Sequence, residues 1–163
     1  MNKNSIIKAN FFFRLFTFFK IPMIFYCGAK IIEFDENKVV VKIPLNFRTK
    51  NHLNSMYFGV LAVGADIAGG IIAMRIIQER KLKFSLVFKD MNAQFLKRAE
   101  TDVHFICEDV EKISKLIEKS LNTGEREEEK INVTAYSNYY TQSEKSKAEI
   151  IAKFELTLSL KKK

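Results

Sequence analysis

A long apolar segment, from Tyr57 to Arg80, restricts the fold of this chain more than any other stretch. Its apolar residues occupy nearly the whole circumference of a helix drawn through them. Asn54 and Ser55, just before it, are residue types that commonly cap the start of a helix. A helix that is apolar all round needs other elements to enclose it. The segment therefore predicts a central helix wrapped by the rest of the chain.

Runs rich in β-branched and aromatic residues on both sides of this helix can supply the enclosing sheet. Two runs before the helix, separated by residues 35–37, predict a hairpin. The six predicted strands are Lys30–Phe34, Lys38–Pro44, Phe84–Lys97, Val103–Val110, Ile131–Tyr140 and Glu149–Leu160. In the last strand one face carries Phe154, Leu156, Leu158 and Leu160, and the other carries Glu155, Thr157 and Ser159. This pattern predicts an α+β fold in which one side of a curved sheet covers the helix.

A short extra helix is predicted between the fourth and fifth strands, from about Glu111 to Leu121. Its apolar residues share one face, and Gly124 follows as a stop signal. The acidic run at 125–129 is typical of a solvated loop or strand edge.

Residues 1–28 form a Phe-rich N-terminal helical segment with two open interpretations. An apolar stripe recurs there at helical spacing: Phe12, Leu15, Phe16 and Phe19. The stripe favours an amphipathic helix laid on the domain. Arg14, Lys20 and Pro22 interrupt the apolar stretch, so no transmembrane span is expected. Peripheral contact with a membrane through Phe, Lys and Arg side chains is the alternative.

Length and composition suit a single domain covering 1–163. The formal net charge of +8 is compatible with nucleic acid, an anionic membrane or a phosphate-bearing ligand. The lysines are scattered and no RNA-binding pattern of aromatic and basic residues occurs, so nucleic acid is not expected as a partner. Cys27 and Cys107 form neither a close pair nor a set with histidines. We therefore expect no metal site, no disulfide framework and a cytoplasmic location.

A single carboxylate, Asp66, interrupts the apolar helix. It lies at the centre of a stripe of small residues at alternating steps of three and four: Gly59, Ala62, Gly69 and Ala73. Because an unpaired buried charge is costly, this carboxylate must be paired, solvated in a cleft or raised in pKa. Asp66 either accepts hydrogen bonds from a neighbouring strand or subunit, or belongs to a functional site, and the pattern leaves both open.

Two motifs resemble the phenylacetate-type acyl-CoA thioesterases of the hotdog-fold superfamily. The run from Asn51 to Gly59, followed by Asp66, is similar to a family segment in which an Asn precedes the helix, a His-Gly-Gly opens it and an acid lies two turns inside. The run from Asp90 to Ala99 is similar to the family strand that ends in a Phe-Leu-Arg-Pro-Ala type turn. The resemblance covers most of the chain, whose added N-terminal segment and extra helix look closer to a separate branch than to the well-studied enzymes.

The resemblance implies a curved antiparallel sheet around the long central helix, in a homodimer or homotetramer with sites between subunits. It implies hydrolysis of an acyl-CoA, with no cofactor beyond the coenzyme A of the substrate. Asp66 would be the general base or nucleophile, and Asn51 of the opposite subunit would orient water or substrate. Amides near Gly59 would polarise the thioester carbonyl, a role that suits the donors at any helix N-terminus. Lys97 and Arg98 would contact the coenzyme A phosphates, although a basic pair at a strand end is also typical of a solvated rim.

Three residues depart from the family pattern. Tyr57 and Phe58 stand where the motif has His-Gly, and Phe88 stands where one branch has a Ser facing the acid. These side chains would line the substrate site, with His52 at its entrance and His104 in a structural position. Three functions stay open: a thioesterase acting on medium or long acyl-CoA, a non-catalytic acyl-CoA or lipid-binding hotdog protein, and an interaction protein at a membrane surface.

Overall fold

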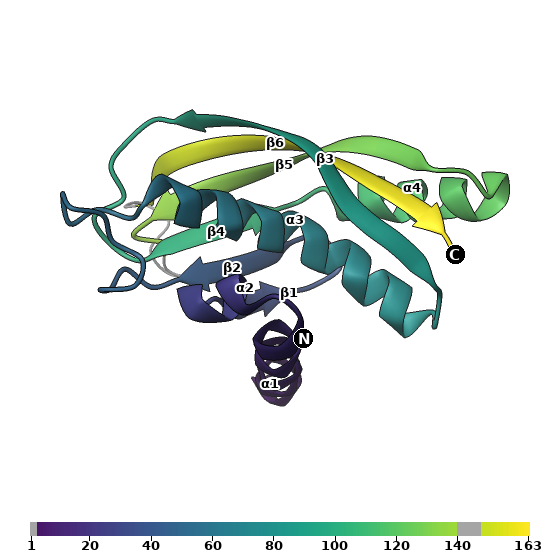
Figure 1. Cartoon of the computed structure of the whole chain (residues 1–163), viewed down its shortest axis with the longest axis horizontal. Helices are drawn as coiled ribbons and strands as arrows, with labels where there is room; N and C mark the ends of the chain where they lie inside the picture. The colour runs from purple at the N-terminus through teal and green to yellow at the C-terminus, as the bar shows by residue number, and fades with distance from the viewer. Residues whose placement is uncertain (1–2, 140–147) are drawn as a thin grey trace.

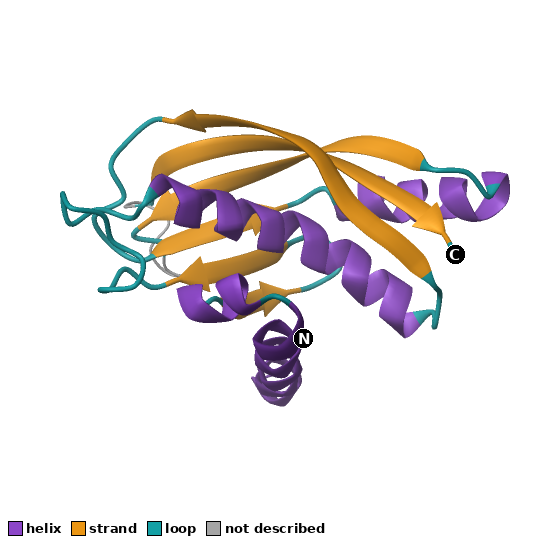
Figure 2. Cartoon of the chain, viewed as in Figure 1, coloured by secondary structure: helices purple, strands orange, loops and turns teal. Residues whose placement is uncertain are grey.

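The computed structural model describes residues 3–139 and 148–163, which form one six-stranded sheet and four helices (Figure 1, Figure 2). The helices are α1 (Lys3–Lys20), α2 (Pro22–Cys27), α3 (Phe58–Glu79) and α4 (Val110–Thr123). The strands are β1 (Lys30–Phe34), β2 (Val39–Ile43), β3 (Phe84–Phe95), β4 (Val103–Cys107), β5 (Glu127–Ser137) and β6 (Glu149–Lys162). Neighbouring strands are antiparallel, in the order β1-β2-β4-β5-β6-β3.

The α+β class and the predicted elements are confirmed, with differences at their ends. β5 begins at Glu127, so part of the acidic run 125–129 is strand and not loop. The predicted end of this strand, Tyr140, lies outside the described residues. Gly124 ends α4 in the left-handed conformation, with φ of 70°, a backbone region that glycine adopts readily.

α3 crosses the concave face of the sheet, which curves around it (Figure 1, Figure 2). The inward row of β6 is the predicted one: Phe154, Leu156, Leu158 and Leu160, all buried. Small residues let the helix backbone lie close to the strands. A Cβ added to Gly64 would overlap with the Phe105 ring of β4, and one added to Gly69 would lie 2.7 Å from Ile131 Cδ1 of β5. Gly64 and Gly69 of α3 therefore leave room for side chains of the strands.

The start of α3 differs from the prediction. Tyr57 occupies the N-cap position and its side chain makes no capping hydrogen bond. Asn54 adopts a left-handed φ of 59° in the preceding loop, and the Ser55 hydroxyl is buried within that loop. The main chain holds the helix start instead, since the Tyr57 N–H donates to the Thr49 carbonyl at 2.9 Å. The predicted capping by Asn54 or Ser55 is therefore wrong.

α1 contacts β1 through a face other than the predicted one. Asn10 Nδ2 donates to the Ile31 carbonyl at 2.7 Å, and Asn10 Oδ1 accepts from the Ile31 N–H at 2.8 Å. Thr17 on the same side of the helix is buried. The predicted contact stripe, by contrast, is exposed: Phe12, Leu15, Phe16 and Phe19. The expectation that this stripe lies on the domain is wrong, because Asn10 anchors the opposite side of the helix to β1 and the stripe faces outward.

By length and composition α3 could also cross a membrane, and among the described helices it is the one with that property. Of its most apolar window, 56% is buried against the rest of the protein, as in the core helix of a wrapped sheet.

Candidate functional site

One side of α3 faces the edge strand β3, and two contacts bring helix and strand side by side. Near the start of α3 the Phe58 and Phe95 ring centroids are 6.2 Å apart. Further along, Cβ atoms added to Gly69 and Gly70 would each lie 3.5 Å from the Phe88 ring. Asp66 lies between these contacts on the helix, as Met91 does on the strand. We name this region the α3–β3 surface, defined by Phe58, Asp66, Gly70, Phe88, Met91 and Phe95.

The Asp66 carboxylate is half-buried and has no partner of its own chain within residues 3–139 and 148–163. No side chain or backbone amide there donates a hydrogen bond to it, and no Lys or Arg forms an ion pair with it. Burial raises the pKa of Asp66 above its ordinary value, because removal from water disfavours the charged form. Such a group is a better proton acceptor near neutral pH than an ordinary surface carboxylate.

The start of α3 offers hydrogen-bond donors near the same surface. The N–H groups of Val60 and Leu61 donate to the Tyr57 carbonyl at 2.9 and 3.2 Å, whereas those of Phe58 and Gly59 have no acceptor in the described part of the chain. A helix N-terminus adds a partial positive charge to such free donors. The rise of an α-helix separates Gly59 from Asp66 by about 10 Å along the axis. The two groups of one chain therefore do not meet at one carbonyl.

Aromatic rings form the apolar part of the surface. Successive ring centroids are 4.8 Å apart for Tyr57 and Phe58, 6.2 Å for Phe58 and Phe95, and 5.9 Å for Phe95 and Phe154. Phe58 is 59% exposed and Phe95 is 49% exposed. Exposed rings gathered in this way are typical of a surface that receives an apolar ligand or another subunit.

Phe95 and Met91 were not predicted from the sequence as site residues. A bulge shifts the β3 register between Phe88 and Asp90. Before the bulge the even-numbered residues lie on the inner face, and after it the odd-numbered residues do. A simple alternation drawn from Phe88 therefore turns Met91 and Phe95 to the wrong side. The consecutive polar residues Lys89 and Asp90 interrupt the apolar alternation, and this interruption is the sequence feature that indicates the bulge.

The loop before α3 carries Asn51 and His52. The Asn51 side-chain oxygen accepts from the N–H groups of Leu53 at 2.8 Å and Ser55 at 3.2 Å, and therefore holds the loop. Its Nδ2 group has no acceptor among the described residues and is the part that can reach a substrate. His52 is exposed on the same loop. The roles of Asn51 and His52 remain predictions.

The basic pair follows β3 directly and lies near the start of α3. Phe95 contacts Phe58, and the Met56 N–H donates to the Ala99 carbonyl at 2.8 Å, so residues 95–99 run beside residues 56–58. Lys97 Nζ pairs with Glu149 at 3.0 Å in an exposed ion pair, and Arg98 is exposed. One end of the α3–β3 surface therefore carries Tyr57, Phe58, Gly59, Lys97 and Arg98. Phe88 lies further along α3 from this end than Asp66 does.

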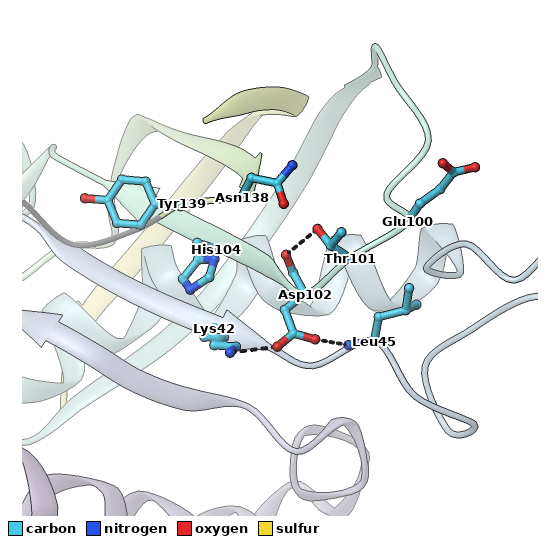
Figure 3. Close-up of a pocket in the computed structure, with 8 residues that line it drawn as sticks. All are labelled: Lys42, Leu45, Glu100, Thr101, Asp102, His104, Asn138 and Tyr139. Atoms are coloured by element: carbon cyan, nitrogen blue, oxygen red, sulfur yellow. Dashed lines mark hydrogen bonds and ion pairs between the residues drawn. The ribbon is translucent and has the colours of Figure 1, made fainter. Parts of the chain in front are cut away.

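A separate open pocket of about 340 Å³ contains His104 (Figure 3). It is lined by Lys42, Leu45, Glu100, Thr101, Asp102, His104, Asn138 and Tyr139. Phe105, next to His104 on β4, points to α3, so His104 lies on the outer face of the sheet, away from Asp66. Burial, and to a lesser extent Lys42, lowers the pKa of His104 to about 4. Neither there nor elsewhere among the described residues do three or more His, Cys, Asp or Glu side chains come together to hold a metal ion.

Comparisons with known proteins agree with this fold. The sequence profile of a family described as a domain of unknown function, DUF4442, matches residues 9–152. No curated protein sequence matches the chain. A protein of unknown function from Chlorobaculum tepidum has a similar structure, with a TM-score of 0.81, 16% identity, and coverage of 97% of this chain and 97% of that chain.

Two further solved structures carry thioesterase names. A thioesterase candidate from Shewanella oneidensis has a TM-score of 0.74 at 13% identity, over 93% of this chain and 96% of that chain. One from Pseudomonas aeruginosa has a TM-score of 0.73 at 21% identity, over 92% and 93%. The chain thus has the hotdog fold and belongs to the DUF4442 family.

Proposed function

We propose that the protein is a thioesterase-like hydrolase that cleaves an acyl-CoA at the α3–β3 surface. The observation that carries the proposal is Asp66, a half-buried carboxylate without a partner among the described residues, two turns inside a helix with free N-terminal donors. The exposed rings of Phe58 and Phe95 lie at the start of the same helix. The thioesterase names of the two structural neighbours support the reaction class.

In the proposed reaction Asp66 acts as general base. It takes a proton from a water molecule as the water oxygen attacks the thioester carbon, and the tetrahedral oxyanion is held by amides at an α3 N-terminus. The carbon–sulfur bond then breaks, and the proton passes from Asp66 to the leaving thiolate. The products are a carboxylic acid and free coenzyme A. Direct attack by the carboxylate, followed by hydrolysis of the anhydride, is the second route open to the same residue.

We propose further that two chains form one site. Because Asp66 and the Gly59 amide of one chain are about 10 Å apart, a second chain must supply one of them. β3 is an edge strand of twelve residues, mostly exposed, and pairing two such edges in a homodimer would continue the sheet. The exposed Phe58 and Phe95 rings would be covered in the same contact. Pairing of two such dimers would form a tetramer.

The residues around the site take supporting roles in the proposal. The Asn51 Nδ2 group would hold water or the substrate carbonyl, and His52 would lie at the entrance. Arg98, and Lys97 after release from Glu149, would contact the phosphates of coenzyme A. Cys27 and Cys107 are buried free thiols, which suits the proposed cytoplasmic location.

The test is thiol release from a panel of short, long and aromatic acyl-CoA substrates by the protein and its Asp66→Asn variant. The matched control is Glu79→Gln, the same carboxylate-to-amide change at an exposed position of α3. We expect turnover to fall by at least about 100-fold in Asp66→Asn, the scale of a lost general base, and to be unchanged in Glu79→Gln. Equal turnover in Asp66→Asn and the unmodified protein would refute the assignment.

A non-catalytic acyl-CoA or lipid-binding protein is the second candidate function. It is favoured by Tyr57, Phe58 and Phe88, whose rings occupy positions close to the helix start and to Asp66. This function predicts retention of acyl-CoA, measurable by calorimetry, without thiol release, and equal retention by Asp66→Asn.

A further inference from the structure

The outward half of α1 is an apolar surface that no described residue covers. The exposed side chains on it are Ile7, Phe11, Phe12, Leu15, Phe16, Phe18 and Phe19. At about 100° per residue these positions span roughly half of the helix circumference. The other side, with Asn10 and Thr17, is fixed to the domain by the hydrogen bonds of Asn10 to Ile31. The apolar half therefore cannot turn inward without breaking this anchor.

A second short helix extends the apolar surface. Pro22 starts α2 directly after α1 ends, and the Phe18 and Phe25 rings meet edge to face with centroids 5.1 Å apart. Met23 and Tyr26 on α2 are exposed. Arg48 lies over the Tyr26 ring, 5.7 Å from its centroid, and over the Phe47 ring at 5.8 Å; Phe47 is itself exposed. We name the surface made by these residues of α1, α2 and Phe47 the N-terminal apolar face.

The charges around this face have one sign. The first 32 residues contain five Lys or Arg and no Asp or Glu. Lys8 lies within the apolar half of α1, and the helical spacing puts Arg14 and Lys20 at its two borders. Arg14 also lies over the Phe25 ring, 5.5 Å from its centroid, which keeps the guanidinium beside the face. Long cationic side chains at the border of an apolar helix face can reach outward to an anionic layer.

We propose that the N-terminal apolar face binds the surface of an anionic lipid bilayer. A helix with Phe and Leu on one half and Lys and Arg at its borders is suited to lie in the plane of the membrane, with its rings among the acyl chains and its cations at the phosphate headgroups. A second copy of the chain fits less well, because two faces of the same positive sign would repel each other. The face lies at the β1 edge of the sheet, the edge opposite β3, so membrane contact leaves the α3–β3 surface free (Figure 1).

The test is co-sedimentation of the full chain with vesicles of phosphatidylcholine alone or of phosphatidylcholine mixed with phosphatidylserine. We expect binding to the mixed vesicles that weakens as salt is added. Phe12→Ser/Phe19→Ser and Lys8→Glu/Lys20→Glu should each reduce it at least about tenfold. These positions are exposed, so both variants should melt at the temperature of the unmodified protein.

Two control variants match these changes at the far side of the sheet. Leu96→Ser removes an exposed apolar side chain, and Lys153→Glu/Lys162→Glu reverses two exposed charges of β6; neither should alter vesicle binding. Absence of binding to anionic vesicles, or equal binding by the Phe12→Ser/Phe19→Ser variant, would overturn the proposal. A dimer in light scattering that becomes a monomer in this variant would show that a second copy occupies the face, and would overturn it as well. No readout here depends on hydrolysis.

Discussion

At the scale of single residues, the half-buried carboxylate of Asp66 makes the stability of the fold depend on pH. Its pKa is raised by burial, so the folded protein holds this proton more tightly than the unfolded chain does. As pH rises from the unfolded pKa through the folded pKa, the carboxyl ionises in the half-buried position and stability falls. At a pH above the folded pKa the protein carries the full cost of this charge, and at a pH below the unfolded pKa it carries none.

Asp66→Asn should therefore raise the free energy of unfolding at pH 7 by on the order of 1 kcal/mol, because the amide carries no charge in the half-buried position. The gain should vanish near pH 3, where Asp66 is protonated in both states. Thermal melts of Asp66→Asn and the Glu79→Gln control at both pH values measure this. A variant that is less stable than the unmodified protein at pH 7 would mean that the carboxylate has a stabilising partner in the assembled protein.

Two glycines of α3, Gly64 and Gly70, should respond in opposite ways to substitution by alanine. A Cβ at Gly64 would overlap with the buried Phe105 ring, whereas a Cβ at Gly70 would meet Phe88 carbons at 3.5 and 3.7 Å, an ordinary contact distance. Alanine favours a helix over glycine by about 1 kcal/mol, and overpacking a core costs about 1–3 kcal/mol. We expect Gly64→Ala to lower the midpoint of urea unfolding and Gly70→Ala to raise it slightly. Equal effects at the two positions would contradict the placement of α3 on β4.

At the scale of elements, Asn10 attaches α1 to the open edge of β1. Its amide pairs with both the N–H and the carbonyl of Ile31, as a neighbouring strand would. Asn10→Ala leaves both groups without this partner, which should cost about 1–3 kcal/mol in the attachment of the helix. Hydrogen exchange should then become faster in α1 and β1, but not in α3. Asn92→Ala, an exposed change on β3, serves as control, and unchanged exchange in α1 would remove Asn10 as the anchor.

The orientation of α1 could not be predicted from the sequence, whereas the position of α3 could. α3 could be predicted because a helix that is apolar all round must be enclosed, and the β-branched runs on both sides of it in the sequence supply the enclosing sheet. α1 has an apolar half, and apolarity alone does not tell whether that half faces its own domain or an outside surface. The hydrogen bonds of Asn10 to Ile31 fix the orientation, and nothing in the sequence marks Asn10 for this role. Asp66 is predicted as a site residue because it is the one carboxylate in the middle of an apolar helix, and Tyr57 and Phe58 because they depart from a family motif. Phe95 could not be predicted, because the bulge in β3 reverses the alternation.

At the scale of the whole molecule, the proposed site needs two chains, and mixing of variants tests this. Asn51→Asp keeps an oxygen for the Leu53 and Ser55 amides but removes the Nδ2 donor. Asp66→Asn removes the proposed general base. Each variant alone should be nearly inactive. If each site takes Asp66 from one subunit and Asn51 from the other, a mixed dimer has one intact site. Random refolding of an equal mixture should then restore about a quarter of the unmodified activity, since half of the dimers are mixed and each has two sites. A mixture of Asp66→Asn and Asp66→Ala is the control and should stay inactive. Mixed dimers that mass measurement detects but that do not regain activity would place both residues in the site of a single subunit.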